Sequence, residues 1–397
     1  MTLSTVRLNE RDRLKVIRAM PDLEGLRGFW TSHQTNRDGD FDFYRFIISS
    51  RREVVRPHVV LHLRDGAPKA MLIGRLEHRD IPIKIGYANL LTLRLRALTF
   101  IDGGTMGAVS DDESELFIGN VRASLRAGEA DVAVLEHLKV NHALYQRAIR
   151  TRSFFSIDRS MRPSSHRVRK LGSSRGSFMA QLSGNERYNQ RRRARRLLQD
   201  FDGKVRIDCF HDATEIGRLL RDAETIASVS YQRGLGVGFF NTCEIEQRLR
   251  LEAEKGTLRA HILYVGDRPC SFWIASLYRG VLCNDFMAFD PTYAKYAPGM
   301  YLAINVIDEV CRDDSAEQAL TIDFGGGDAE WKERLGNFDW QEATVHIWAP
   351  TVKCIAANAL RTFAAIAEAS TTRVLRDTGL LSKVKRTWRK RIAQRSY

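Results

Sequence analysis

The sequence predicts an α/β protein made of two similar units. Two observations carry this prediction: both halves of the chain show the same order of helices, strands and turns, and 397 residues exceed one small domain. At roughly 150 residues per domain, the length predicts two or three domains. Hydrophobic residues make up 44% of the chain, which is enough to fill their cores.

The first half is expected to form a helix, two strands joined by a tight turn, a third strand, a glycine-containing loop, a helix and a fourth strand. Helical periodicity and short apolar runs assign these elements. The first helix is residues 41–50, and the strands are residues 59–63, 70–76, 95–101 and 132–138.

The second half repeats this order, and Pro68 and Pro269 occupy equivalent places in the two tight turns. The repeated helix is 244–254, and the repeated strands are 261–265, 271–277, 281–289 and 320–324. Further elements surround the repeat: a basic helix, an early strand, a helix after the third repeated strand and a final strand, at residues 183–199, 205–210, 299–311 and 343–348. We infer a duplicated α/β unit.

The joint between the units is expected where proline, glycine, serine and basic residues replace the apolar periodicity. Ser183, followed three residues later by Glu186, predicts the cap of the basic helix that opens the second unit. The expected parts are a degenerate first unit, a linker, the second unit and a basic helical tail, at residues 1–161, 162–177, 178–350 and 351–397.

The formal net charge of +14 points to a polyanionic partner such as RNA, anionic lipid headgroups or a phosphorylated small molecule. Six arginines lie between Arg187 and Arg196, and seven basic residues lie between Lys383 and Arg395. A solvated helix face is an equal alternative for either cluster. Base-reading motifs are missing from the sequence, so we expect no DNA partner.

The six cysteines form no close pair and lie at no zinc-binding spacing, so we expect reduced core residues and no metal. No run of about 20 apolar residues occurs, and residues 1–13 do not resemble a signal peptide. The expected location is therefore the cytoplasm. Residues 380–397 offer the alternative that the protein binds peripherally to the inner face of the membrane.

A strand that runs into a loop and then a helix predicts an anion site in the second unit. Residues 284–290 enter the loop 291–298, and a helix opens at Gly299. The first amides of a helix lack internal partners and carry partial positive charge, so a pyrophosphate is a natural occupant. Pro298 suits a helix entry, and Gly299 allows close approach of a ligand to the backbone. A lone Pro-Gly before a helix is more often ordinary capping than an anion site.

Five segments in the second half occur in an order that resembles a known superfamily. They are Arg191–Leu197, Ser230–Gly236, the turn Gly266–Pro269, Tyr293–Gly299 and Asp323–Asp328 with Trp331-Lys332 behind it. Together they resemble the GNAT acyltransferases, and within them the CelD-like enzymes of polysaccharide synthesis and the FemAB-type aminoacyltransferases. The loop 296–301 departs from the usual coenzyme A loop at its first and last positions.

The resemblance implies two tandem GNAT-like units, each with a mixed central sheet flanked by helices, and acyl-CoA as co-substrate. It implies that backbone amides of residues 286–289 polarise a thioester carbonyl. It also places Tyr231 and Gln232 near the acceptor. The residues expected to contact the coenzyme are Phe286, Ala288, Tyr296, Pro298, Gly299, Met300 and Tyr301.

Asp285 and Asp323 are the candidate catalytic bases, since each lies on an expected central strand where burial can raise a carboxyl pKa. Asp323 has an equal alternative as the cap of the glycine turn that follows it. Lys332 is a candidate contact for a phosphate or carboxylate of either substrate. Core packing for Tyr231 and solvation for Lys332 remain open alternatives.

The tail pattern predicts a basic amphipathic helix that lies on an anionic membrane surface. Its apolar residues recur at three- and four-residue spacing, at Leu381, Val384, Trp388 and Ile392. A tail packed on the body of the protein is the alternative.

These observations favour an acyltransferase that moves an acyl group from acyl-CoA to an amino or hydroxyl group of a sugar or lipid-linked envelope precursor. The arginine-rich helix keeps a second hypothesis open, transfer from aminoacyl-tRNA. A third is a non-catalytic membrane-associated protein of the same fold.

Overall fold

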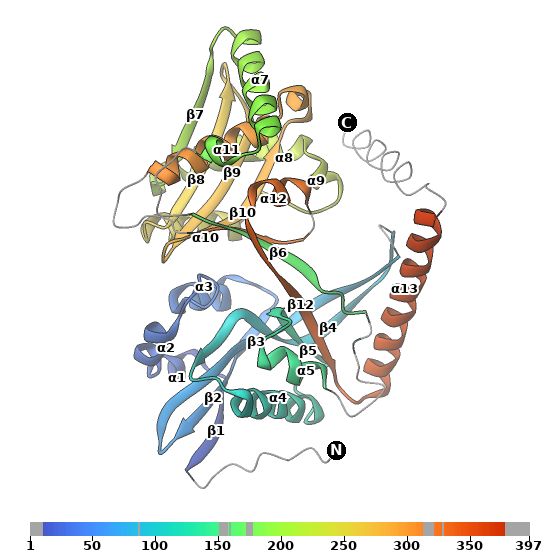
Figure 1. Ribbon diagram of the computed structural model, residues 1–397. Helices are drawn as coiled ribbons and strands as arrows, with labels where there is room; N and C mark the ends of the chain where they lie inside the picture. Colours follow the sequence, from blue (N-terminus) through green and yellow to red (C-terminus); the bar gives the residue numbers. More distant parts are fainter. Residues whose placement is uncertain are drawn as a thin grey trace. The chain divides into compact units, whose positions relative to one another are not determined.

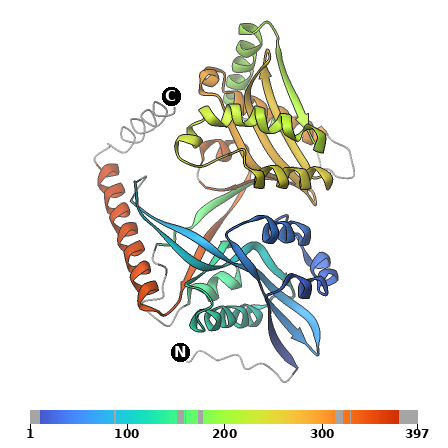
Figure 2. The same cartoon turned by 180° about the vertical axis from the view of Figure 1, so that it is seen from behind.

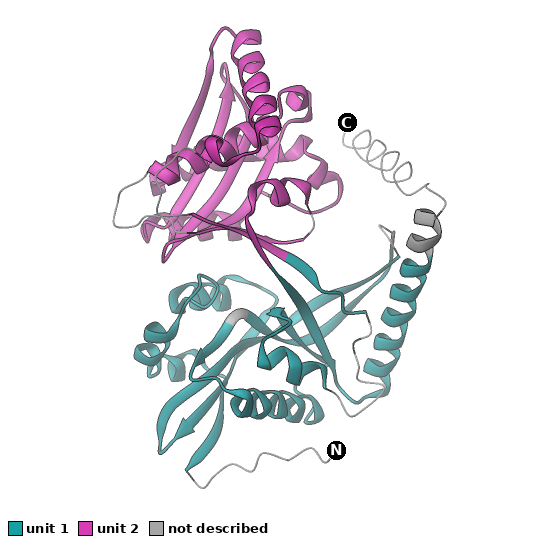
Figure 3. Ribbon diagram, in the orientation of Figure 1, with its two compact units in different colours: residues 1–165, 340–378 teal, residues 166–339, 379–397 magenta. Residues whose placement is uncertain are grey.

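The computed structural model describes residues 11–85, 88–150, 158, 160–171, 178–312, 321–327 and 329–377. The chain forms two compact units (Figure 3). Unit 1 comprises residues 1–165 and 340–378, and unit 2 comprises residues 166–339 and 379–397.

Unit 1 is built on a sheet with the strand order β1-β2-β3-β4-β5-β12 (Figure 1). Neighbouring strands are antiparallel except β4 and β5, which are parallel. The strands are β1 (Asp12–Ile17), β2 (Val54–Arg64), β3 (Ala67–Ile85), β4 (Ala88–Gly107), β5 (Val132–Lys139) and β12 (Phe338–Trp348).

Helices cover both faces of this sheet. One core joins the sheet to α4 (Asp111–Arg126), α5 (Ala143–Ile149) and α13 (Val352–Asp377). A second core, around Trp30 and Tyr44, joins the other face to α2 (Arg27–His33) and α3 (Phe41–Ser50), which follow the short helix α1 (Met20–Glu24).

Unit 2 repeats the pattern with the strand order β6-β11-β10-β9-β8-β7. Only β10 and β11 are parallel among its paired strands. The strands are β6 (Ser164–Lys170), whose first two residues count with unit 1, β7 (Val205–Phe210), β8 (Leu258–Val265), β9 (Arg268–Tyr278), β10 (Val281–Phe289) and β11 (Thr321–Gly326).

Two helical layers flank this second sheet (Figure 2). The layer on one face contains α6 (Phe178–Gln181), α7 (Gly184–Asp200), η3 (Pro291–Tyr296), α11 (Pro298–Arg312) and α12 (Glu330–Leu335). On the other face, η2 (Ala213–Glu215), α8 (Ile216–Val229), α9 (Tyr231–Gly234) and α10 (Cys243–Glu254) follow one another along the chain.

The two units exchange one strand each. β6 follows the first half of the sequence yet pairs with β11 of unit 2. β12 follows the second half yet pairs with β5 of unit 1, from Glu342 opposite Lys139 to Trp348 opposite Val132. Neither half of the sequence therefore contains all the strands of its own sheet.

The observed boundaries differ from the expected ones because of this exchange. The segment expected as a linker, 162–177, contains strand β6, and the final strand expected in the second unit belongs to unit 1 from Trp340 onward. The segment 351–397 begins with α13, which packs on unit 1. The proposed amphipathic helix at 380–397 lies outside the described residues.

Within the described residues, none of the helices combines the length and the apolar character that crossing a membrane requires.

Candidate functional site

A break in the sheet of unit 2 creates the candidate site. β10 and β11 pair only where Val281–Cys283 run beside Thr321–Asp323. Beyond that point β11 continues beside β6, so the outer edge of β10 is left open. In the same place β10 carries a bulge: Asn284 lies opposite Ala275 and Phe286 lies opposite Ile274, which leaves Asp285 as the extra residue.

The backbone of β10 presents amides to this opening. The N–H of Asp290 donates to the carbonyl of Cys270 on β9 at 2.9 Å. The backbone N–H and C=O groups of the even-numbered residues after the bulge therefore face β9. The carbonyl of Met287, in contrast, accepts a hydrogen bond of 3.2 Å from the Gln232 side chain. Because backbone groups alternate along a strand, the amides of Met287 and Phe289 face away from β9 and into the opening.

The start of α11 closes the opposite side of the opening. Ala297 adopts a left-handed conformation, with φ 51°, and Pro298 begins the helix. The amides of Met300 and Tyr301 both donate to the carbonyl of Ala297, and proline has no N–H. Gly299 therefore keeps the one amide of this corner that is free to bind a ligand.

These elements surround a cavity of about 460 Å³. Its walls are mainly apolar, and the side chains that form them come from the α9 region, β9, β10, α11 and α12. The large apolar residues among them are Phe239, Phe272, Phe286, Met287, Phe289, Met300, Trp331 and Leu335. An apolar cavity beside free backbone amides suits a ligand with an apolar group next to a polar one.

Asp285 lies in the wall of the cavity and carries a buried ion pair. Its side chain is 6% exposed and pairs with the guanidinium of Arg248 on α10. Arg248 also donates from Nε to Glu252 at 3.0 Å. Two carboxylates thus share one buried guanidinium, which fixes the position of Asp285.

Asp323 has a different environment from Asp285. Its Oδ1 accepts a hydrogen bond of 2.7 Å from the amide of Gly325 and lies 2.7 Å from Nε2 of His166 on β6. It is not among the residues that line the cavity. The contact with Gly325 is the turn-capping arrangement that was the alternative to a catalytic role.

Lys332 reaches the cavity from α12. Its ammonium group donates to the carbonyl of Gly326 at 2.7 Å and lies 5.7 Å from the ring centre of Trp331. Trp331 packs edge-on against Phe324 of the core. The lysine charge is thus held beside the cavity by the glycine turn after β11.

Tyr231 and Gln232 form the rim on the α9 side. Tyr231 is 52% exposed, so core packing does not explain it. Gln232 is held by its bond to Met287. Gly238, with φ 92°, approaches the Gln232 side chain so closely that a Cβ at Gly238 would lie 3.0 Å from Gln232 Cβ. The glycine of this loop therefore shapes the rim.

The expected coenzyme-binding residues divide into two groups. Phe286, Ala288, Gly299 and Met300 line the cavity, whereas Tyr296, Pro298 and Tyr301 do not. Tyr296 is buried, and its hydroxyl donates to Asp200 at the end of α7, which lowers the pKa of that carboxyl. Burial raises the pKa of Tyr301.

Sequence reasoning missed three residues at the site: Arg248, His166 and Phe239. Arg248 lies outside the quoted motifs, Phe239 lies three residues after the motif Ser230–Gly236, and His166 lies in the segment expected as a linker. Arg248 and Glu252 are four residues apart on a helix, and this spacing predicts an ion pair between their side chains. Nothing in the sequence pointed to its contact with Asp285.

A larger cavity of about 1090 Å³ lies beside the C-terminal half of α11. None of the expected site residues lines it. His261 and Glu309 face it, and burial lowers the pKa of His261 to about 4, so this imidazole is neutral at pH 7. We therefore place the site in the smaller cavity, where backbone donors and the predicted residues converge.

The protein-family comparison matches a segment of unit 2 that lines both cavities. Residues 184–333 match the family described as "Acetyltransferase (GNAT) domain". This segment is similar to a GNAT acetyltransferase domain. The matched residues include the whole of the cavity wall except Leu335. No curated protein sequence matches the chain.

Solved structures resemble the chain in fold at low sequence identity. The crystal structure of FemX has 10% identity and a TM-score of 0.50, covering 84% of this chain and 97% of its own. A tandem GNAT protein from the clavulanic acid biosynthesis pathway has 10% identity and a TM-score of 0.49, with 85% and 99% covered. L-PGS from Bacillus licheniformis has 14% identity and a TM-score of 0.46, with 88% and 98% covered.

The predicted fold class is confirmed: the chain is α/β, with a mixed sheet flanked by helices in each unit. In the described residues, no group of three or more histidine, cysteine, aspartate or glutamate side chains is arranged to hold a metal.

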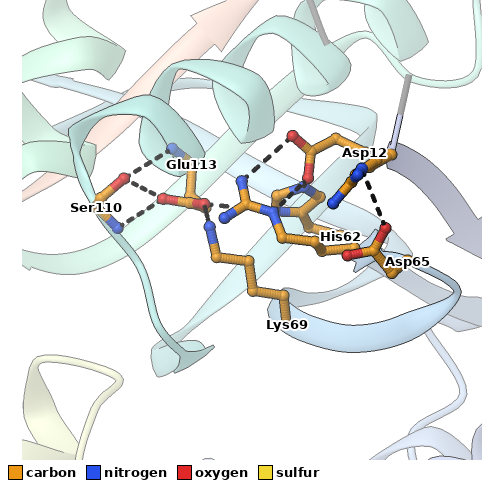
Figure 4. Close-up of polar contacts among 8 residues, drawn as sticks. Asp12, His62, Asp65, Lys69, Ser110 and Glu113 are labelled. Atoms are coloured by element: carbon orange, nitrogen blue, oxygen red, sulfur yellow. Dashed lines mark hydrogen bonds and ion pairs between the residues drawn. The ribbon is translucent and has the colours of Figure 1, made fainter. Parts of the chain in front are cut away.

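Unit 1 has a counterpart of the α11 corner, but the carboxylate of Glu113 occupies it. α4 follows β4 as α11 follows β10. Ser110 caps α4 by accepting the amides of Asp112 and Glu113, and Glu113 accepts the amide of Ser110 (Figure 4). Burial acts to raise the pKa of Glu113, but hydrogen bonds from Lys69 and Ser110 lower it to about 2. A ligand phosphate would meet a fixed carboxylate there.

Proposed function

We propose that unit 2 transfers an acyl group from acyl-CoA to an amino or hydroxyl group of a sugar or lipid-linked cell-envelope precursor, as in the CelD-like branch. The main observation behind this proposal is the cavity in which the amides of Met287, Phe289 and Gly299 lie beside the buried carboxylate of Asp285. The GNAT match over the same residues supports the proposal.

The donor end of the cavity fits a diphosphate and a thioester. Gly299 offers a free amide at a helix N-terminus, where the dipole favours negative charge. The amides of Met287 and Phe289 are placed to stabilise a negatively charged carbonyl oxygen, a contribution worth about 3–4 kcal/mol per donor in enzymes with oxyanion holes. Acyl-CoA would supply the activated acyl group, and the phenylalanine walls would hold its apolar chain.

The acceptor end fits a nucleophile that must lose a proton. Asp285 is the one carboxylate of the expected pair that lines the cavity, and Arg248 holds it in place. In this proposal Asp285 accepts the proton of the amine or hydroxyl. Tyr231, Gln232 and Lys332 supply the polar contacts that orient a sugar. Asp323 positions the glycine turn whose Gly326 carbonyl accepts a hydrogen bond from Lys332.

Calorimetric titration of the full chain with acetyl-CoA and longer acyl-CoA tests the donor. Heat of binding and an increase of thermal stability are expected, with longer acyl chains binding more tightly because of the apolar walls. The absence of heat and of thermal shift for every chain length would reject the donor.

A second candidate function is transfer from aminoacyl-tRNA. The observation that favours it is the exposed face of α7, where Arg191, Arg192 and Arg195 are exposed and form no ion pair with an acidic side chain of the described residues. Binding of tRNA with a steep inverse salt dependence would support a phosphate-contacting surface. Only transfer of the charged amino acid to an acceptor would establish this reaction.

A third candidate is a non-catalytic protein that keeps the fold. The shortage of free amides at the α11 corner favours it, and the open cavity opposes it. Acyl-CoA binding without turnover of any amine or hydroxyl acceptor would favour this reading.

A further inference from the structure

α13 carries an apolar face that the described protein leaves uncovered. Val352, Leu360, Phe363 and Ile366 are exposed, Val352 by 86% and Phe363 by 71%. At 100° per residue these four side chains fall within about 120° of the helix circumference. The opposite side of α13 is buried against unit 1 through Cys354, Ala357 and Ala364. Exposed stripes of this kind mark binding surfaces.

A second apolar feature of unit 1 lies at the end of the long hairpin of β3 and β4. Leu90 and Leu91 are both exposed there, at 59% and 45%. α13 packs along β3, and Figures 1 and 2 show the hairpin extending toward this helix. Six of the large exposed apolar side chains of unit 1 thus belong to two neighbouring elements.

The cations beside these features have carboxylate neighbours in two places: Lys353 pairs with Asp131 at 3.4 Å, and Arg94 lies opposite Asp80 across the hairpin. Lys84 and Arg94 flank the hairpin end, and Lys353 lies in the first turn of α13. Beyond α13, residues 381–397 contain seven basic residues and no acidic one. A partner with an apolar interior and a negatively charged surface matches both properties.

We infer that the exposed face of α13 and the β3–β4 hairpin end form a docking surface for an anionic lipid bilayer. Phe363, Ile366, Leu90 and Leu91 enter the acyl region, and the flanking lysines and arginines contact the headgroups. A cover made by residues 381–397 is disfavoured, because their seven basic residues would lie against Lys84 and Arg94. The inference does not depend on the transfer reaction.

Vesicle co-sedimentation of the full chain tests this surface. The protein is expected to sediment with vesicles of phosphatidylcholine and phosphatidylglycerol at 7:3, and to stay in solution with phosphatidylcholine alone. The triple variant L360Q/F363Q/I366Q should lower the partition coefficient at least about 10-fold, since three apolar contacts are lost. The single variant F363Q should show a smaller loss, which keeps the test valid if the triple variant folds poorly.

The matched control is V55Q, which changes a similarly exposed apolar residue of unit 1 outside this surface. It should bind vesicles as the unchanged protein does. Equal vesicle binding by F363Q, L360Q/F363Q/I366Q and the unchanged protein would overturn the inference. So would a concentration-dependent dimer, seen by light scattering, that these variants abolish while vesicle binding persists. Equal binding to neutral vesicles would also contradict it.

Discussion

Replacing Gly299 by alanine and by leucine should have opposite consequences. A Cβ at this position would lie 3.5 Å from the Phe289 ring and 3.8 Å from Ser271 Oγ, which is ordinary contact. Its φ does not require glycine, so alanine should stabilise the helix by up to about 1 kcal/mol. Leucine extends further into the cavity of about 460 Å³, beside the amide that we assign to the diphosphate.

Calorimetric titration with acyl-CoA distinguishes the two variants. Gly299→Ala should keep the dissociation constant within about threefold, and Gly299→Leu should weaken binding at least about 10-fold, or 1.4 kcal/mol. Gly217→Leu on α8, whose Cβ would meet only the end of the Arg221 side chain, is the control and should bind normally. Normal binding by Gly299→Leu would refute our placement of the diphosphate.

Three other perturbations have defined outcomes. Arg248→Met should destabilise the protein by about 3–5 kcal/mol, because Asp285 and Glu252 then face each other without a cation, as measured by denaturant unfolding. Glu113→Gln should destabilise unit 1 at neutral pH. Because the folded pKa of Glu113 is about 2 and its ordinary value is 4.5, the difference from the unchanged protein should vanish as the pH falls from about 4.5 to 2. A fragment of residues 1–161 should not fold, as judged by circular dichroism, since it lacks β12.

Two variants serve as controls for Arg248→Met. The triple variant of Arg248→Met with Asp285→Asn and Glu252→Gln should recover most of the lost stability, because no buried charge remains unpaired. Arg250→Met, in an exposed pair with Glu246, should cost less than about 1 kcal/mol. A cooperative unfolding transition in the 1–161 fragment would contradict the strand exchange.

The alternation of strands and helices was predictable because its signals are local. The tight turns, the apolar strands that follow them and the helix after Pro298 all appear at the expected positions. The strand exchange was not predictable, since pairing partners depend on contacts between distant residues. β6 also has a weak signal, because its sequence Ser-Ser-His-Arg-Val-Arg-Lys contains one apolar residue.

The candidate site was predictable in outline and not in its contacts. Gly299, Phe286, Tyr231, Gln232 and Lys332 come together in one cavity, because the loop and helix order that marked them also brings them to the open edge of β10. The bulge at Asp285 leaves no mark in the sequence pattern, so the side on which Asp285 lies could not be read from alternation.

The strand exchange has a consequence for the site. The open edge of β10 exists because β11 continues beside β6, a strand that the chain completes before it enters the rest of unit 2. His166 of β6 contacts Asp323, and Asp323 shapes the glycine turn that holds Lys332. The segment expected as a linker therefore contributes a strand that supports the residues of the site.

The crystal structure of the full chain soaked with coenzyme A tests the central claim most directly. Our account predicts that the diphosphate lies within hydrogen-bonding distance of the Gly299 amide, with the thiol end directed at the amides of Met287 and Phe289. Coenzyme A bound in the larger cavity beside His261, or along the arginines of α7, would contradict it.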